Sequence, residues 1–263
     1  METLFLDKIF NEDCISGMKN IPDNSVDCVI CDLPYSKLHY DWDKMIPVNQ
    51  LWEQYDRICK PNAAIILFCV EPFTSHLVMS NIKNFRQKLT WLKNRPTNVF
   101  NAKKQFMNWT EDILVFYKKQ PTFNPQYIDR KKATVKKRKK HQEFHIWGKT
   151  GEKDNYVSRY DLHHGYPKTV LNYTEHNGGK FHHPCQKPVD LLRYLIRTYT
   201  NPGDVVLDNC IGSGSTAIAA MREKRHYIGY EIEEKYYNMS LERIEDEKNR
   251  VVEEEALKSY ALF

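Results

Sequence analysis

Four consecutive residues, Asp32-Leu33-Pro34-Tyr35, have the groups needed to act on an amine attached to an aromatic ring. The lone pair of such an amine is delocalised into the ring, so the amine is a poor nucleophile. Asp32 and the Leu33 carbonyl can accept its two N–H groups and localise the lone pair toward a methyl donor. Pro34 stiffens the turn, and Tyr35 offers a flat face for a base turned out of a duplex. The tetrapeptide indicates methylation of an exocyclic amine; a strand-end turn with an aspartate cap is the structural alternative.

A second candidate site lies where a predicted strand, residues 205–208, passes into a predicted helix, residues 217–224. Gly212 and Gly214 stand between them. Glycines let the backbone approach a ligand, and the N–H groups of a helix start favour an anion such as a carboxylate or phosphate. A dinucleotide fingerprint would need another glycine at position 217, where the chain has Ala217. The turn predicts a cofactor site; a tight connection built from small residues is the alternative.

Glu231 stands at the end of the next predicted strand, 23 residues after Asp208. An acidic side chain there can accept hydrogen bonds from both ribose hydroxyls of a nucleoside cofactor. NAD and S-adenosylmethionine both carry such a ribose, so this position does not choose between them. The alternative is an acid that opens the N-terminus of the last helix.

The elements that must position these residues alternate between strands and helices. The predicted strands cover residues 26–32, 63–70, 89–93, 113–117, 205–208 and 227–231. The predicted helices cover residues 48–58, 72–79, 188–200 and 217–224, with a last helix that presents Tyr237, Leu241 and Ile244 on one face. This order is typical of a parallel sheet, so we predict an α/β fold with a doubly wound, Rossmann-like sheet.

The middle of the chain interrupts this rhythm. Residues 120–180 show no lasting period, and eight of the eleven residues from Arg130 to Lys140 are Lys or Arg. Such a run is typical of a solvated loop, and also of a surface that binds a phosphate backbone. We expect residues 1–119 to form the catalytic half of one domain, residues 120–180 an inserted recognition region, and residues 181–263 the cofactor-binding half.

The composition is that of a soluble globular protein. The 263 residues include 39 basic and 34 acidic side chains, a net charge of +5, and 41% are hydrophobic, which excludes disorder as the main state. The longest apolar run, residues 63–70, is far shorter than the roughly 20 residues that cross a bilayer. Residues 1–10 lack the basic region and the apolar region of a signal peptide. We expect a cytoplasmic protein.

The cysteines and histidines do not indicate a disulfide or a metal site. Seven cysteines are an odd number, and several lie in apolar stretches. Cys28 and Cys31 form a C-x-x-C, but side chains three apart on a strand point to opposite faces. His182, His183 and Cys185 share no regular ligand spacing with other residues.

These segments together resemble the DNA amino-methyltransferases of the β class, in which a catalytic D-P-P-Y tetrapeptide precedes the cofactor motifs. The tetrapeptide here has Leu33 in place of proline. Asn209 and Cys210 replace the proline and the aromatic residue of the family's D-P-F-x-G-S-G-[ST]-T motif. Further similar segments are residues 11–14 and 22–27 before the catalytic strand, residues 109–116, where Thr110 replaces the usual His, and residues 183–189, which are similar to H-P-T-Q-K-P.

The resemblance implies transfer of a methyl group from S-adenosylmethionine to the N6 amine of adenine in double-stranded DNA, with base flipping and no metal. Cytosine-N4 is the alternative target, although Asp rather than Ser at position 32 favours adenine. The implied catalytic residues are Asp32, Leu33, Pro34 and Tyr35. The implied cofactor residues are Asp13 at the adenine end, Glu231 at the ribose, Gly212 and Gly214 at the methionine backbone, Gln186 and Lys187 near its carboxylate, and Asp208 and Thr216 in the same motif. The implied DNA contacts are Lys131, Lys132, Lys136, Lys137, Arg138, Lys139 and Lys140.

Other functions stay open at this point. A nicotinamide-dependent oxidoreductase would use the glycine turn but leaves the tetrapeptide and the basic run unexplained. A catalytically silent nucleic-acid-binding protein would follow if Leu33 and Cys210 had spoiled the cofactor pocket. The resemblance also leaves open a homodimer and a restriction endonuclease as partners.

Overall fold

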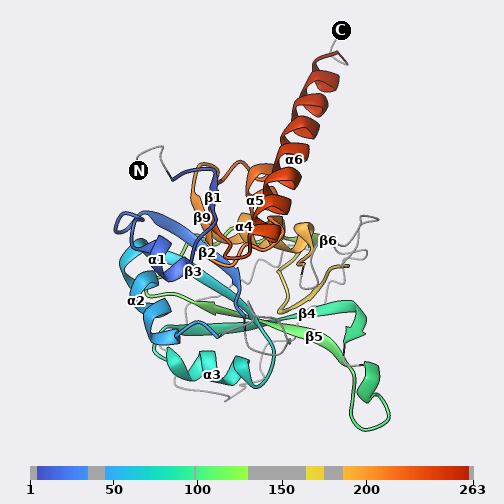
Figure 1. The fold of residues 1–263 in the computed structure, drawn as a ribbon. Coiled ribbons are helices and arrows are strands. Elements are labelled where there is room, and N and C mark those ends of the chain that lie inside the picture. The colour runs from blue at the N-terminus through green and yellow to red at the C-terminus, as the bar shows by residue number, and fades with distance from the viewer. Residues whose placement is uncertain (1–4, 35–44, 98, 130–163, 175–185, 261–263) are drawn as a thin grey trace, which may run out of the picture. The chain divides into compact units, whose positions relative to one another are not determined.

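An eight-stranded sheet forms the centre of the computed structural model, which describes residues 5–34, 45–97, 99–129, 164–174 and 186–260 (Figure 1). The strand order is β1-β10-β9-β2-β3-β5-β4-β8. The strands are β1 (Lys8–Phe10), β2 (Val26–Asp32), β3 (Cys59–Cys69), β4 (Phe85–Thr97), β5 (Asn108–Phe116), β8 (Val170–Asn172), β9 (Val205–Asp208) and β10 (His226–Tyr230). The helices are α1 (Cys14–Met18), α2 (Val48–Ile58), α3 (Phe73–Ser80), α4 (Val189–Tyr199), α5 (Ser215–Arg222) and α6 (Glu234–Tyr260), with a 3₁₀ turn η1 (Val99–Asn101).

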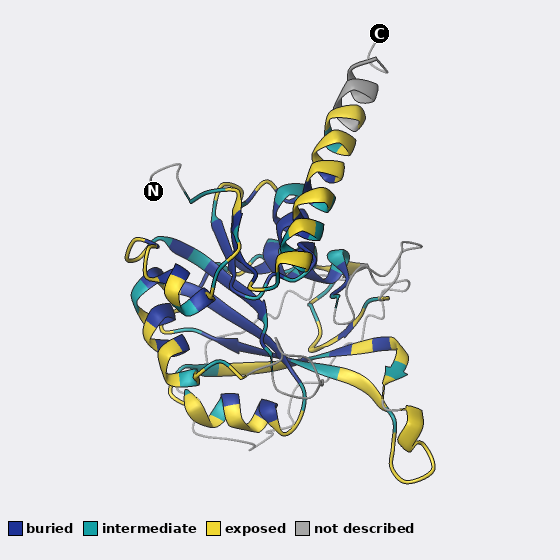
Figure 2. Ribbon diagram, viewed as in Figure 1, coloured by how far each residue is buried: buried dark blue, intermediate teal, exposed yellow. Residues whose placement is uncertain are grey.

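Helices cover both faces of this sheet. The apolar side chains of α1, α2 and α3 pack in one core cluster, and those of α4, α5 and α6 pack in the other. Figure 2 shows the central strands between them, β2 and β3, as largely buried. Along β2, Cys28 and Ile30 belong to one cluster while Val29 and Cys31 belong to the other, as the pleat of a strand requires. The prediction that the C-x-x-C cysteines point to opposite faces is confirmed.

The strand order brings together segments that are distant in the sequence. β2 pairs in parallel with β9, so that Cys28 lies opposite Val206. Because carboxyl ends of parallel strands meet at the same edge of a sheet, Asp32 at the end of β2 and Asp208 at the end of β9 face one crevice. The fold therefore joins the tetrapeptide and the glycine turn at one edge.

The predicted α/β fold is confirmed, and the main differences concern β4 and β5. Both are longer than the predicted strands at residues 89–93 and 113–117, and β5 runs antiparallel to β3 and β4. The additional residues of β4 are mostly polar and exposed, for example Gln87 and Lys88. An apolar pattern cannot detect strand residues of this kind, because their pairing is made by backbone groups.

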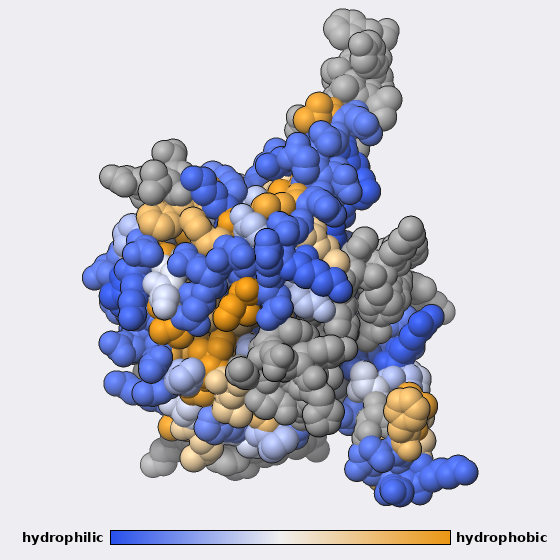
Figure 3. Space-filling model, in the orientation of Figure 1, coloured by the Kyte–Doolittle hydropathy of each residue, from blue (hydrophilic) through white to orange (hydrophobic). Residues whose placement is uncertain are grey.

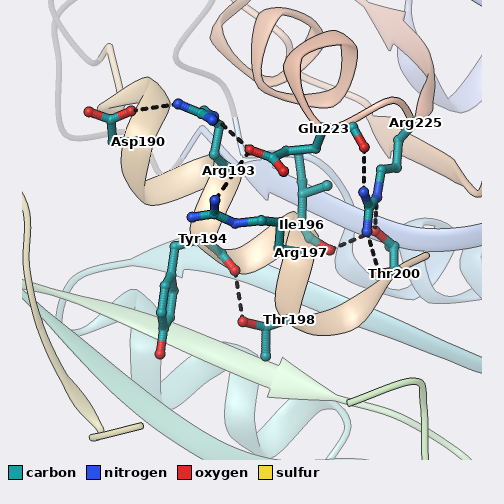
Figure 4. A network of polar contacts seen from close by, with 9 residues as sticks. All are labelled: Asp190, Arg193, Tyr194, Ile196, Arg197, Thr198, Thr200, Glu223 and Arg225. Carbon is teal, nitrogen blue, oxygen red and sulfur yellow. Dashed lines mark hydrogen bonds and ion pairs between the residues drawn. The ribbon is translucent and has the colours of Figure 1, made fainter. Parts of the chain in front are cut away.

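A polar network fastens α4 to the end of α5 (Figure 4). The Arg193 Nε donates to Glu223 Oε1 at 2.7 Å. Arg225 Nε donates to Thr200 Oγ1 at 2.9 Å, and its Nη2 donates to the Thr200 carbonyl at 2.6 Å. Because α4 begins at Val189, two residues after Lys187, fixing this helix also restrains the segment that carries Gln186 and Lys187.

The chain divides into two compact units, residues 1–124 with 169–263, and residues 125–168. Within the described part of the second unit, β6 (Ile128–Asp129) and β7 (His164–Gly165) pair antiparallel. The basic run of residues 130–140 lies outside the described residues. None of the helices that the structure describes combines the length and the apolar character that a membrane span requires.

Candidate active site

A cavity of about 710 Å³ opens at the carboxyl ends of β2 and β9. This volume is in the usual range for a site that binds a small molecule or cofactor. The residues of both predicted motifs line it, Asp32, Leu33 and Pro34 from the first and residues 208–213 from the second. The two stretches therefore share one cleft, as the sequence predicts.

The other predicted site residues divide into three groups. Asp13, Gln186, Lys187, Thr216 and Glu231 also line the cavity. Gly214 does not line it but forms the N-cap of α5. Tyr35, Lys131, Lys132, Lys136, Lys137, Arg138, Lys139 and Lys140 lie outside the described residues, as do His182, His183 and Cys185.

Asp32 forms a close ion pair in this cavity. The Lys187 Nζ lies 2.6 Å from Asp32 Oδ2, and both side chains are largely buried. The same ammonium lies 5.4 Å from the centre of the Phe68 ring, a cation–π distance. The resemblance places Lys187 near the carboxylate of a cofactor, whereas the contact seen here is with the carboxylate of Asp32.

Two further charged residues extend this pair into a chain of four alternating charges. Glu111 Oε2 lies 3.2 Å from Lys187 Nζ, and Glu111 Oε1 lies 3.1 Å from Lys93 Nζ. The Lys93 side chain is only 2% exposed. Burial opposes ionisation of Glu111, but the Lys187 and Lys93 ammonium groups outweigh it and lower the pKa of the Glu111 carboxyl. The four charges of this cluster sum to zero, which reduces the free-energy cost of burying them.

Sequence reasoning missed the roles of Glu111 and Lys93. Glu111 falls within the segment 109–116 that resembles a family motif, but that resemblance does not identify its partner. Lys93 and Glu111 come from neighbouring strands, with Trp91 opposite Glu111 in the register of β4 and β5. A lysine and a glutamate 18 positions apart give no recognisable spacing in a sequence, so only the pairing of the strands reveals them.

The glycine turn packs against helix α6. Gly214 has a φ of 81°, a left-handed conformation that favours glycine. A Cβ at this position would also lie 3.1 Å from Ser240 Cβ of α6. Arg243, also on α6, donates to the Ser213 carbonyl and, at 2.8 Å, to Ser213 Oγ. These contacts with α6 hold the turn in one conformation.

Glu231 connects the turn to the end of β10. Its Oε2 accepts the Gly212 N–H at 2.9 Å, and its Oε1 accepts the Glu233 N–H at 2.9 Å. Burial raises the pKa of the Glu231 carboxyl, although these two hydrogen bonds oppose the shift. Each carboxylate oxygen has a second lone pair, so Glu231 can organise the turn and still accept from a ligand in the cavity.

The side chains of Asp13 and Asn209 each accept a hydrogen bond from another group of the protein. Asp13 is the N-cap of α1, and its Oδ1 accepts the Ser16 N–H at 2.9 Å. Asn209, which stands where the resembling family has proline, is buried, and its Oδ1 accepts from the Tyr55 hydroxyl at 2.5 Å. A buried polar group costs little when it is paired in this way. The Tyr55 hydroxyl on α2 therefore explains how a buried asparagine side chain can stand at position 209.

The cavity wall also contains thiols and no recognisable metal site. Cys14, Cys31 and Cys210 line it, and the six cysteines of the described part are free. Burial raises the pKa of Cys31 to about 12, so its thiol stays neutral at physiological pH. In the portion of the chain that the structure covers, no group of three or more His, Cys, Asp or Glu is arranged to hold a metal ion.

Asp208 is buried beneath the turn. Its Oδ2 accepts from Thr216 Oγ1 at 2.6 Å, and its Oδ1 accepts the Cys210 N–H at 3.1 Å. Burial raises the pKa of Asp208 to about 7, and these hydrogen bonds only partly oppose the shift. Protonation at neutral pH would thus relieve an unfavourable buried charge.

The raised pKa of Asp208 makes a pH-dependent contribution to stability. Between about pH 4 and pH 7 the Asp208 carboxyl ionises in the unfolded state but stays protonated in the folded state. Its contribution to the free energy of unfolding is therefore lost as the pH rises through this range. The free energy of unfolding of the wild type minus that of Asp208→Asn should therefore fall as pH rises through this range and level off above it. Urea denaturation at several pH values measures the difference. A difference that stays flat or rises would contradict the burial effect.

Comparison with known proteins gives consistent matches over most of the chain. A family model described as DNA methylase, of the N6/N4 methyltransferase group, matches residues 26–242. The Type II methyltransferase M.BglII of Bacillus subtilis is 28% identical over 97% of this chain and 74% of its own length. The structure of the M1.HpyAVI–SAM complex is 23% identical, covers 90% of this chain and 98% of its own, and has a TM-score of 0.61. The cytosine-N4-specific PvuII DNA methyltransferase is 16% identical, with 94% and 92% coverage and a TM-score of 0.63.

Proposed function

The chain belongs to the N6/N4 family of DNA methylases, and we propose that it transfers a methyl group from S-adenosylmethionine to the N6 amine of adenine in double-stranded DNA. The observation that carries this proposal is the shared cavity, in which Asp32 and the glycine turn with Glu231 line the same space. A donor held on the turn and a base held at Asp32 would thus meet inside one pocket.

The cavity has the features that S-adenosylmethionine requires. We assign the Glu231 carboxylate to the ribose hydroxyls and the turn at Gly212 to the methionine backbone, because both line the cavity. Asp13 is assigned to the adenine end, with Gln186, Asp208 and Thr216 on the remaining wall. M1.HpyAVI, a similar fold, is known as a SAM complex. When bound, S-adenosylmethionine supplies an electrophilic methyl group and a thioether leaving group.

The residues of this chain orient and activate the amine. Asp32 and the Leu33 carbonyl accept the two N–H groups of the base, so that the nitrogen lone pair points toward the donor. As the new N–C bond forms, positive charge develops on the amine nitrogen, and the Asp32 carboxylate stabilises it. One amine proton is then lost to water or to Asp32. Buried apolar residues such as Ile30 and Phe68 line the same cavity and exclude competing water.

We assign Lys187 to the positioning of Asp32 in this reaction. Its ammonium holds Oδ2 at 2.6 Å and is itself held by Glu111, so the carboxylate has a fixed orientation beside a positive charge. We assign the amine to the other oxygen, Oδ1. Lys187 thus acts on the base through Asp32.

Adenine is assigned as the target because position 32 is an aspartate rather than a serine, and the inserted region 120–180 is assigned to target recognition. We assign the basic residues of positions 131–140 to phosphate contacts, because lysine and arginine side chains attract a phosphate backbone. Phosphate contacts position a protein on DNA without choosing a sequence, so base-specific contacts must come from other residues of that region.

Binding of the cofactor product tests the cavity assignment. S-adenosylhomocysteine at 100 times its Kd should raise the melting temperature by about 5 °C or more through mass action, whereas NAD at equal concentration should not. Differential scanning fluorimetry provides the measurement. Stabilisation by NAD alone would instead favour a nicotinamide-dependent enzyme.

A further inference from the structure

The tip of the β4–β5 hairpin, defined here as residues 99–107, exposes aromatic side chains. Phe100 and Phe106 are 105% and 98% exposed, Val99 in the same tip is 57% exposed, and the nearby Trp109 is 44% exposed. Figure 1 shows this end of the hairpin projecting away from the sheet, and Figure 3 shows apolar atoms among hydrophilic ones there. Isolated exposed apolar residues are ordinary, but two fully exposed phenylalanines at one turn mark an interaction site.

The charged side chains of this stretch of the chain are all basic. Arg95, Lys103 and Lys104 are exposed, and the sequence from Leu92 to Thr110 contains no acidic residue. Cations attract a phosphate backbone, and aromatic faces stack on bases or insert between them. Together they match the surface of a nucleic acid.

The tip is also continuous with the strand that reaches the catalytic cluster. Glu111 lies on β5, 3.2 Å from the Lys187 ammonium that holds Asp32. Asn108, where β5 begins, is three residues from Glu111, which corresponds to about 10 Å of strand. The strand β5 thus links the tip directly to the cluster that holds Asp32, the residue to which the target base is assigned.

We propose that this hairpin tip binds duplex DNA beside the target base, with Lys103 and Lys104 on phosphates and with Phe100 and Phe106 against the base stack. Extrusion of a base leaves its neighbours unstacked, and an aromatic side chain at that place stabilises the opened duplex. This inference rests on the proposed function, because it takes DNA as the substrate. It assigns a second DNA surface, separate in sequence from the basic run 130–140.

Direct DNA binding tests the aromatic part of the proposal. The double variant Phe100→Ala/Phe106→Ala should bind sheared, unmethylated genomic duplex DNA at least about tenfold more weakly than the wild type in filter binding with S-adenosylhomocysteine present. Its affinity for S-adenosylhomocysteine and its melting temperature should not change, since both side chains are exposed. The matched control is Met79→Ala/Ile82→Ala, which removes two exposed apolar side chains, one in the last turn of α3 and one just after it, and should bind DNA as the wild type does.

The basic part has its own readout. Lys103→Ala/Lys104→Ala should reduce the slope of log affinity against log salt by about 2, because each lost phosphate contact contributes roughly 0.9. Wild-type DNA affinity in the aromatic variant, or an unchanged salt slope in the lysine variant, would overturn the hairpin proposal. The proposal would also be overturned if the variants lost only binding to anionic phospholipid vesicles, or only self-association, and kept their affinity for DNA. Failure of the wild type to methylate DNA would count against the proposed function alone, because the binding comparison does not depend on turnover.

Discussion

Replacing Asp32 by alanine should lower the rate of methyl transfer at least about 1000-fold, the scale of losing a preorganised electrostatic contact to the transition state. The carboxylate is assigned to the amine and not to the cofactor, so the Kd of S-adenosylmethionine should change less than about threefold. The fold should survive, because Lys187 retains Glu111 at 3.2 Å as a second partner. Single-turnover assays with labelled S-adenosylmethionine give the rate, and calorimetry gives the affinity.

Two companion variants sharpen this test. Asp32→Asn keeps one oxygen acceptor but no charge, so its rate should fall between those of the wild type and the alanine variant. Asp23→Ala removes an exposed aspartate that pairs with Arg57 outside the cavity, and it should transfer methyl groups at the wild-type rate. Wild-type turnover by Asp32→Ala would refute the role assigned to this residue.

Replacing Lys187 by methionine should lower the transfer rate about 100-fold at pH 7, with partial recovery at higher pH. Without this ammonium, Asp32 loses the cation that lies 2.6 Å from its Oδ2, whereas Glu111 keeps Lys93 at 3.1 Å. The pKa of a buried carboxyl rises when its counterion is lost. Because the active form of Asp32 is ionised, the acidic limb of the pH–rate profile should move to higher pH. Lys187→Arg, which keeps the charge, should restore part of the rate.

The two assignments of Lys187 predict different kinetics. If it positions Asp32, the loss lies in kcat and depends on pH. If it binds the carboxylate of the methionine end, as the family resemblance implies, the Kd of S-adenosylmethionine rises and the pH profile keeps its shape. A matched control is Lys60→Met, which removes a partly exposed lysine that pairs with Asp27 away from the cavity and should leave both quantities unchanged.

The sequence predicts the elements that carry strong periodic or punctuated signals. The helices α2 and α4 begin directly after Pro47 and Pro188, where proline fits the start of a helix. The strands β2 and β9 are short apolar runs that end in Asp32 and Asp208. Their side-by-side pairing follows from the parallel fold, so the shared cavity could be anticipated from the motifs.

The charge chain and the hairpin tip could not be found in the same way. Lys93 lies in a strand whose exposed residues are mostly polar, and its buried contact with Glu111 depends on the antiparallel register of β4 and β5. Phe100 and Phe106 look like core residues in a sequence, because large apolar side chains are usually buried. Only the three-dimensional structure shows that both are fully exposed.

The contact between Lys187 and Asp32 could not be predicted from the sequence for the same reason. A lysine in a Q-K-P segment can reach either a ligand or a neighbouring strand, and the sequence contains no distance between positions 187 and 32. The fold places these two residues 2.6 Å apart, across 155 positions of the chain.

The identity of the methylated nucleoside tests the central claim most directly. Unmethylated duplex DNA is incubated with the protein and S-adenosylmethionine that carries a ¹³C-methyl group, then digested to nucleosides and analysed by mass spectrometry. We expect the label in N6-methyldeoxyadenosine, and its absence with Asp32→Ala. Label found solely in N4-methyldeoxycytidine would contradict the assignment of adenine at Asp32. So would the absence of any labelled nucleoside when the protein is shown to bind the cofactor.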